Sequence, residues 1–213
     1  LLGLLLVPTF HSVSKPLSVN AANHLMLIGH PFSVRMGIFG HFETFLHCKF
    51  PKHKLVVRNL GWPADEITRS RGGVLMPRPT GFGNLHEQLA AQKSDLIFAC
   101  FGLNESFAGE AGLKKFERDL DSFLTELQMG KFNGKTLPRI VLVSPIATEQ
   151  DGGNRNANLA AYTSVMAKVA MTRGIRFADL FSPTRKWMAE NKGQTLTFNG
   201  IHLTEYGDRI VSR

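Results

Sequence analysis

Five short apolar runs are spaced through this chain and constrain its fold more than any other feature. They cover residues 25–28, 55–57, 96–101, 140–143 and 175–177. The segments between them carry apolar residues at helical spacing, most clearly in 36–50, 113–127 and 159–171. Apolar runs that alternate with helices are typical of a parallel sheet with helices on both faces. The pattern therefore predicts an α/β fold, a three-layer α/β/α sandwich on a five-stranded parallel sheet.

The helical segments also show where they end and which side they bury. In 36–50 an inward apolar stripe is expected from Phe39, Phe42, Phe45 and Leu46. Gly130 should end the helix in 113–127, and Gly174 should cap the helix in 159–171. Two irregular stretches, 69–81 and 149–158, are expected as loops at the edge of the sheet where such folds bind ligands.

Composition fits one globular domain. The 213 residues are 43% hydrophobic and 20% charged, which excludes a disordered chain. The net charge is +8, but the basic residues are scattered and form no run or stripe, so nucleic-acid binding is not expected. The two cysteines, Cys48 and Cys100, cannot build a disulfide scaffold or a CxxC metal site, and Cys100 is expected as a buried thiol.

The chain opens on a strongly apolar stretch, Leu1–Pro8, followed by a polar stretch and the small pair Ala21-Ala22. The stretch is too short to span a bilayer, so no stable membrane insertion is expected. It is typical of the apolar region of an export signal, which predicts a leader-like segment at 1–22, one domain at 23–213, and a periplasmic or extracellular location. A buried first strand is the alternative interpretation of the same residues.

Two polar groups follow apolar segments at distant points of the chain. Asn104 lies in the turn that follows the run at 96–101, and His202 lies in a turn before a helix start. An amide that donates to an oxyanion and a histidine that moves a proton are the groups that acyl transfer requires. Together they suggest a hydrolytic site.

These residues fall into short sequence blocks that resemble those of the SGNH (GDSL-type) hydrolase superfamily. The resemblance covers about residues 25–213 and implies a flavodoxin-like strand order, 2-1-3-4-5. The family's first block is Gly-Asp-Ser, with the serine as nucleophile. Here the block is Gly29-His30-Pro31-Phe32-Ser33, so Gly29 is kept but Pro31, which has no nucleophilic atom, stands at the serine position.

The second and third blocks supply the oxyanion donors of the family. Asn59–Asp65 matches the second block, and the resemblance implies that the Gly61 N–H is a donor. Gly102-Leu103-Asn104-Glu105 matches the family's Gly-x-Asn-Asp, which implies that the Asn104 side chain is the other donor. A tight turn at Gly61 and a turn-capping role for Asn104 are the structural alternatives.

The fourth block of the family is Asp-x-x-His, and here it is Asn199-Gly200-Ile201-His202. The resemblance implies that His202 is the base, but Asn199 replaces the carboxylate that would orient it, a costly change in such triads. Two of the three triad members thus differ. Ser33 or Ser106 could replace the nucleophile, and Asp65 or Glu105 could replace the carboxylate.

The resemblance narrows to a subgroup of bacterial SGNH-like domains that lack the first-block serine and are often modules of larger exported proteins. Similar phrases here are Phe39–Glu43, Asn59–Asp65 and Asn104–Glu110. The expected function is an ester hydrolase acting on a small-molecule or carbohydrate ester, such as an acetylated carbohydrate, with Gly61, Asn104 and His202 in the site. The alternative is a binding module that uses the same cleft. No cofactor is expected, and the histidines show no i, i+4 pairing that would support a zinc site.

Overall fold

A computed structural model describes residues 17–20, 23–68, 83–149 and 154–213. Its five strands form one parallel sheet in the order β2-β1-β3-β4-β5, which confirms the predicted fold class and strand order. The strands lie within two residues of the five apolar runs: β1 (His24–Gly29), β2 (Val56–Asn59), β3 (Leu96–Cys100), β4 (Arg139–Val143) and β5 (Arg176–Ala178).

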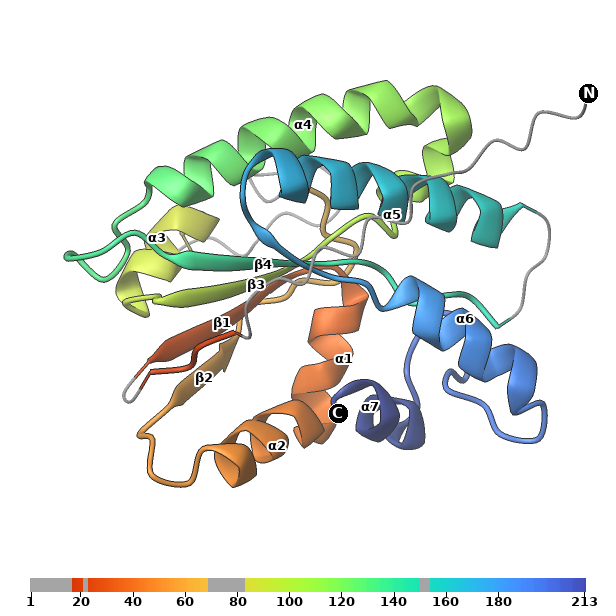
Figure 1. Cartoon of the computed structure of the whole chain (residues 1–213), viewed down its shortest axis with the longest axis horizontal. Coiled ribbons are helices and arrows are strands. Elements are labelled where there is room, and N and C mark those ends of the chain that lie inside the picture. Colours follow the sequence, from red (N-terminus) through yellow and green to blue (C-terminus); the bar gives the residue numbers. More distant parts are fainter. Residues whose placement is uncertain (1–16, 21–22, 69–82, 150–153) are drawn as a thin grey trace, which may run out of the picture.

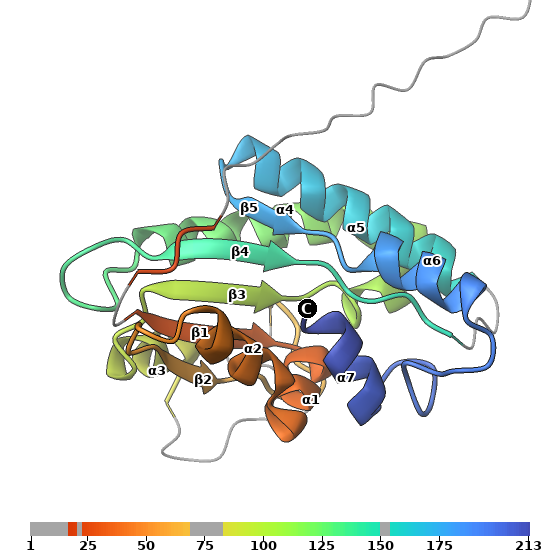
Figure 2. The same ribbon diagram turned by 60° about the horizontal axis from the view of Figure 1, so that its bottom comes forward.

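Helices cover both faces of the sheet (Figures 1 and 2). On one face lie α3 (Leu85–Ala91), α4 (Gly109–Met129) and α5 (Arg155–Thr172). On the other face lie α1 (Pro31–Phe39), α2 (His41–Lys49) and α7 (Glu205–Val211). Two further elements lie at the carboxyl end of the strands: the short 3-10 helix η1 (Glu105–Ala108) after β3 and α6 (Phe181–Glu190) after β5.

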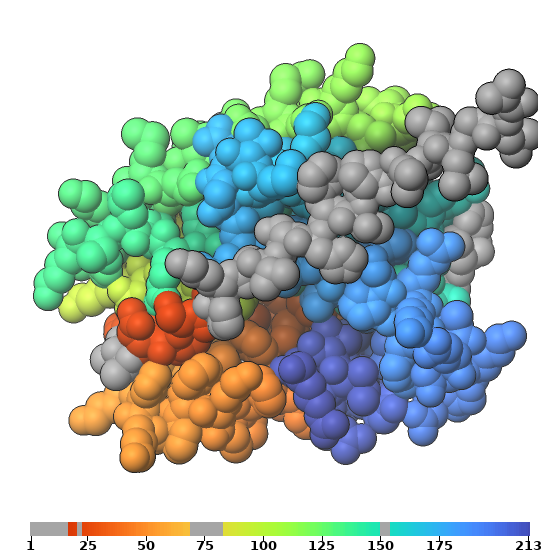
Figure 3. Space-filling model, in the orientation of Figure 1, coloured from red at the N-terminus to blue at the C-terminus, as the bar shows by residue number. Residues whose placement is uncertain are grey.

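The core is divided by the alternation of side chains along each strand. In β1, Met26 and Ile28 pack under α3, α4 and α5, whereas Leu25 and Leu27 face α1 and α2. The C-terminal helix α7 closes this second layer and lies against α1 in the space-filling view (Figure 3). Because all five strands are parallel, the segments that lead from the strands into both helical layers begin at the same edge of the sheet, the carboxyl edge.

The prediction of one helix over 36–50 is wrong, because Gly40 divides it into α1 and α2. Gly40 has φ +71°, in the left-handed region that ends a helix, and its N–H donates to Met36 O at 3.1 Å. The expected stripe is correspondingly incomplete. Leu46 is buried and Phe42 packs on the core, but Phe39 lies under the Arg35 guanidinium and Phe45 under the Lys49 ammonium.

The other helical predictions hold, with both helices longer than expected. α4 ends at Gly130, and Gly174 follows α5 with φ +63°. The loop expected at 149–158 is shorter, since α5 begins at Arg155, while the loop expected at 69–81 and most of the leader-like segment lie outside the described residues. None of the described helices is long and apolar enough to cross a bilayer. The thiol of Cys100 is buried, as expected, and burial raises its pKa to about 12.

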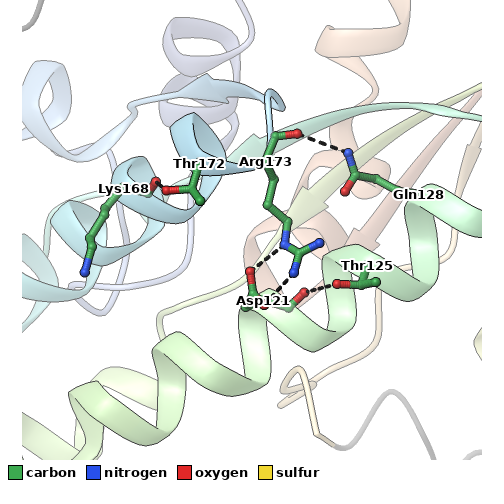
Figure 4. Close-up of polar contacts among 6 residues, drawn as sticks. All are labelled: Asp121, Thr125, Gln128, Lys168, Thr172 and Arg173. Carbon is green, nitrogen blue, oxygen red and sulfur yellow. Dashed lines mark hydrogen bonds and ion pairs between the residues drawn. The ribbon is translucent and has the colours of Figure 1, made fainter.

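A polar contact ties α4 to the end of α5 (Figure 4). The Arg173 guanidinium donates through Nε and Nη2 to the two carboxylate oxygens of Asp121, and the Arg173 carbonyl accepts from Gln128 Nε2 at 3.2 Å. The paired guanidinium lowers the pKa of Asp121 below its ordinary value. Both side chains are partly exposed, so the stabilisation is modest.

We expect Arg173→Ala to lower the free energy of unfolding by about 0.5–1 kcal/mol at pH 7. Arg173→Lys, which keeps the charge but loses the two-pronged contact, should fall between wild type and Arg173→Ala. Because the pKa of Asp121 is lower in the folded state, the difference should be present above pH 4 and disappear as the pH falls through that lowered pKa. Urea unfolding from pH 2 to 7 measures this, and a pH-independent difference would contradict it.

Candidate functional site

The site is built around the end of β1. Gly29 has φ +113°, and a Cβ on this residue would lie 1.9 Å from the Cys100 carbonyl oxygen of β3. On its other side, the Gly29 carbonyl accepts from the Trp62 N–H at 2.9 Å, which brings in the segment after β2. Only glycine lets the three strand ends approach this closely.

His30 follows Gly29 and begins α1. Its Nδ1 accepts from the Phe32 N–H at 3.2 Å as the N-cap of the helix, and Pro31 stands at the first helical position, where its missing N–H costs nothing. The ring is almost fully buried. Burial lowers the pKa of His30 to about 3, and the nearby His202 ring lowers it further. A hydrogen bond to the Phe101 backbone raises the pKa but does not offset the burial, so the imidazole stays neutral.

Ser33 is also fully buried, and its hydroxyl is turned into the protein. Ser33 Oγ donates to the His30 carbonyl at 2.8 Å, one turn back in α1. The same oxygen lies against Gly61, where a Cβ would come within 2.2 Å of it. Ser33 therefore supports the segment after β2 and makes no hydrogen bond to His202.

The segment after β2 is held by Asn59. Its Nδ2 donates to the Ser33 carbonyl, and its Oδ1 accepts from the Gly61 N–H at 2.9 Å. The Gly61 N–H, which the sequence predicted as an oxyanion donor, thus already has an acceptor within the chain. Asp65 lies further along, buried, and its Oδ1 accepts from the Glu66 N–H at 3.2 Å.

The turn after β3 carries Asn104 toward this segment. Asn104 Nδ2 donates to the Asp65 carbonyl at 3.0 Å, which uses one of its two amide hydrogens and leaves the other. Ser106 Oγ donates to the Leu103 carbonyl at 2.6 Å and is buried in η1, so this hydroxyl also points away from His202.

Glu105 joins the same two segments. Its Oε1 accepts from the Ile67 N–H and its Oε2 from the Gly102 N–H, both at 2.9 Å, so the carboxyl group faces these amides and makes no contact with His202. Burial raises the pKa of Glu105 to about 7, despite the two N–H groups that favour the charged form. Glu105 is thus a carboxyl group with a pKa near neutral pH in the pocket that Asn104 also lines.

We expect Glu105→Gln to change how stability depends on pH. The pKa of Glu105 is raised on folding. Its contribution to the free energy of unfolding is therefore fully present below the unfolded pKa near 4.5 and is lost as the pH rises through 7. The neutral glutamine has no such loss. The stability difference between wild type and variant should therefore shrink by on the order of 3 kcal/mol between pH 4.5 and 8, and a constant difference in urea unfolding would refute the buried, titrating carboxyl group.

His202 enters the site from the segment before α7. Its Nδ1 lies 3.0 Å from the Asn199 amide, whose Oδ1 also accepts from the His202 N–H at 3.0 Å. The ring stacks on Phe198, with centroids 5.6 Å apart. Desolvation lowers the pKa of His202, and the Arg35 guanidinium acts in the same direction. Both effects favour the neutral ring, and Nε2 has no hydrogen-bond partner in the described part of the chain.

Two residues outside the sequence blocks hold this segment in place. Arg35 in α1 donates to the Leu203 carbonyl from Nε at 3.1 Å and from Nη2 at 2.8 Å, and its guanidinium lies 5.1 Å from the centre of the Phe198 ring. Glu149, after β4, accepts from the Leu196 N–H at 2.7 Å and the Thr197 N–H at 2.8 Å. Sequence analysis missed both, and neither lies in a pattern that could have shown its partner.

The four sequence blocks thus meet at the carboxyl edge of the sheet, but their side chains form two groups. His30 lines a small pocket together with Leu103, Gly200 and Ile201, and His202 lies beside it. Asn104 and Glu105 instead line a separate pocket with Ile67 and Tyr162. His30 is a functional candidate that the sequence placed in the first block but assigned no role.

Within the described ranges, no three His, Cys, Asp or Glu side chains gather closely enough to hold a metal ion. No serine, threonine or tyrosine hydroxyl of these residues hydrogen bonds to the His202 ring. What the geometry offers is an imidazole paired with the Asn199 amide, and a second amide, that of Asn104, in the separate pocket.

Solved structures with the same fold include acetylxylan esterases. Axe2 from Geobacillus stearothermophilus is 16% identical, with 92% of this chain and 94% of that chain covered and a TM-score of 0.70. The acetyl xylan esterase AlAXEase is 15% identical, with 89% and 96% covered and a TM-score of 0.63. Catalytic mutants of Axe2 replace a serine, an aspartate and a histidine, the last two being three residues apart.

No curated protein matches this chain. A family model does, over residues 41–210, and its description is the GDSL-like lipase/acylhydrolase family. The matched range takes in the blocks of Gly61, Asn104 and His202 and begins after Gly29–Ser33. Since it spans most of the sequence, the chain belongs to the GDSL-like lipase/acylhydrolase family.

Proposed function

We propose that this protein hydrolyses an ester, specifically an acetyl ester of a carbohydrate, with His202 as the general base. The observation that carries the proposal is the setting of His202: Nδ1 is paired with Asn199 and the pKa is lowered. When Nδ1 carries the ring proton and donates it to Asn199 Oδ1, Nε2 is free to accept a proton. Family membership supports acyl hydrolysis, and the acetylxylan esterases with the same fold support an acetylated carbohydrate as the substrate class.

The nucleophile in this proposal is water. Pro31 cannot attack an ester, and the hydroxyls of Ser33 and Ser106 donate to backbone carbonyls inside their own helical turns. His202 Nε2 takes a proton from water as the water oxygen bonds to the ester carbonyl carbon. The bond to the alcohol oxygen then breaks, and the imidazolium returns the proton to that oxygen. Asn104 lines the separate pocket, so its second amide hydrogen must turn toward His202 to stabilise the negative oxygen between these steps.

A binding module is the second candidate, and one observation favours it. The Gly61 N–H is already bonded to Asn59 Oδ1 at 2.9 Å, so one of the two oxyanion donors must leave an internal partner before it can act. A cleft that holds an acetylated glycan without cleaving it fits that arrangement.

The test compares release of acetate from acetylated xylan by wild type, His202→Ala and His47→Ala. The control residue His47 is an exposed histidine in α2 whose Nε2 lies 3.7 Å from Glu43 Oε1. We expect slow hydrolysis by wild type and by His47→Ala, and a rate about 10²–10⁴ times lower for His202→Ala, the usual contribution of a general base. Because the pKa of His202 is lowered, activity should persist below pH 6.5 before it falls with protonation.

No turnover by wild type, or equal turnover by all three proteins, would reject the hydrolase. Wild-type binding of the acetylated glycan without acetate release would then favour the binding module.

A further inference from the structure

A second cleft lies behind the loop that follows β4. It has a volume of about 380 Å³, in the range of small-ligand sites, and its polar lining includes Thr148, Glu149, Asn156, Arg185, Lys192 and Gln194. These residues come from the loop after β4, the start of α5, and α6 with the segment after it. None of them belongs to the four sequence blocks.

This cleft shares a wall with the His202 site. Thr148 lines both the cleft and the small pocket that His30, Gly200 and Ile201 line. The Glu149 N–H donates to the Gly200 carbonyl at 3.3 Å, and the Glu149 carboxylate holds the segment that leads to His202. A substrate that extends past Thr148 from the His202 site would therefore reach this cleft.

The charges in the cleft are unbalanced. Arg185 and Lys192 are exposed, and neither has an acidic partner among the described residues; the Arg185 guanidinium lies 5.9 Å from the centre of the Phe181 ring. Among the described residues that line the cleft, Glu149 alone is acidic, and its carboxylate already accepts from the N–H groups of Leu196 and Thr197. A third cation, Arg155, lines the pocket on the other side of Thr148.

We infer that this cleft binds an anionic sugar residue of the glycan, with its carboxylate or sulfate group between Arg185 and Lys192. The inference rests on the proposed function, in which the His202 site takes the acetyl ester. It adds that the acetylated glycan is anionic. No aromatic side chain lines the cleft in the described part of the chain, so charge rather than stacking supplies the affinity. The planar fork of Arg185 suits either anion.

The affinity for trisaccharides without acetyl groups, measured by calorimetry, tests this anion site independently of hydrolysis. The probes are a trigalacturonate, a sulfated trisaccharide and neutral xylotriose, each at low and high salt. The variants are Arg185→Gln/Lys192→Gln and, as a control with the same loss of charge, Lys52→Gln/Lys54→Gln on exposed residues before β2. Thermal unfolding confirms that both variants fold.

We expect wild type and the control to bind an anionic trisaccharide about tenfold tighter than xylotriose, with affinity falling at high salt. The Arg185/Lys192 variant should lose this preference, and the anion that wild type binds more tightly identifies the group. Equal affinity for all three probes, or an equal loss in the control variant, would overturn the inference. Because these probes carry no ester, a protein that binds them but releases no acetate contradicts only the proposed hydrolysis.

Discussion

Pro31→Ser combined with Asn199→Asp is expected to raise the rate of p-nitrophenyl acetate hydrolysis by about 10²-fold or more over the parent. The change supplies a serine at the family's nucleophile position and a carboxylate at Nδ1 of His202, on a scaffold that already holds His202 and Asn104 at the sheet edge. Each single variant should stay near the parent rate, since a nucleophile and its oriented base act as a unit.

The first helix should tolerate this change. Residue 31 is the first residue of α1, and the cap made by His30 Nδ1 does not depend on the proline. Adding His202→Ala to the double variant is the control, and it should abolish the gain. A folded double variant without new activity would show that residue 31 lies outside reach of His202 or that Gly61 does not leave Asn59, and would favour the binding module.

Gly29→Ala should cause the largest loss of stability of any change considered for this protein. An alanine there must adopt φ +113° and place its Cβ 1.9 Å from the Cys100 carbonyl oxygen, so β1 and β3 have to separate. Backbone strain and overpacking together should cost about 3–5 kcal/mol. Urea unfolding measures this cost, and loss of soluble protein is the expected result if the cost exceeds the stability of the domain.

Gly134→Ala is the matched control for this prediction. Gly134 also has a positive φ, +74°, but a Cβ there meets nothing within 4 Å. Its cost should be near the intrinsic penalty of about 1–2 kcal/mol for a left-handed alanine. Equal losses of stability in the two variants would show that the close approach of the strand ends is not the reason for glycine at position 29.

Much of the architecture was determined by the sequence itself. The five apolar runs located every strand, and the apolar periodicity located α4 and α5, because burial of a repeating apolar face is a local property of the chain. The short helices α3 and α6 were missed, whereas the start of α7 was indicated by the turn that carries His202. At seven to ten residues, α3 and α6 carry too few apolar positions for the period to stand out.

The sequence also indicated that Gly29, Gly61, Asn104 and His202 meet, since each block follows a strand or lies beside one, and the carboxyl ends of parallel strands share one edge. Local pattern misjudged the helix at 36–50. Its apolar spacing continues through Gly40, but the left-handed turn at that glycine redirects the chain and leaves Phe39 and Phe45 under neighbouring cations instead of in the core.

Only the tertiary structure decided which group each polar side chain meets. Arg35 contacts a carbonyl 168 residues away, Glu105 an amide 38 residues away, and the Glu149 carboxylate two amides nearly 50 residues away. The sequence left Ser33 and Ser106 as possible nucleophiles, but in the structure each hydroxyl donates to a backbone carbonyl three residues earlier in the chain. Hydrogen-bond partners depend on distances of a few ångströms between folded segments, and no sequence spacing encodes those distances.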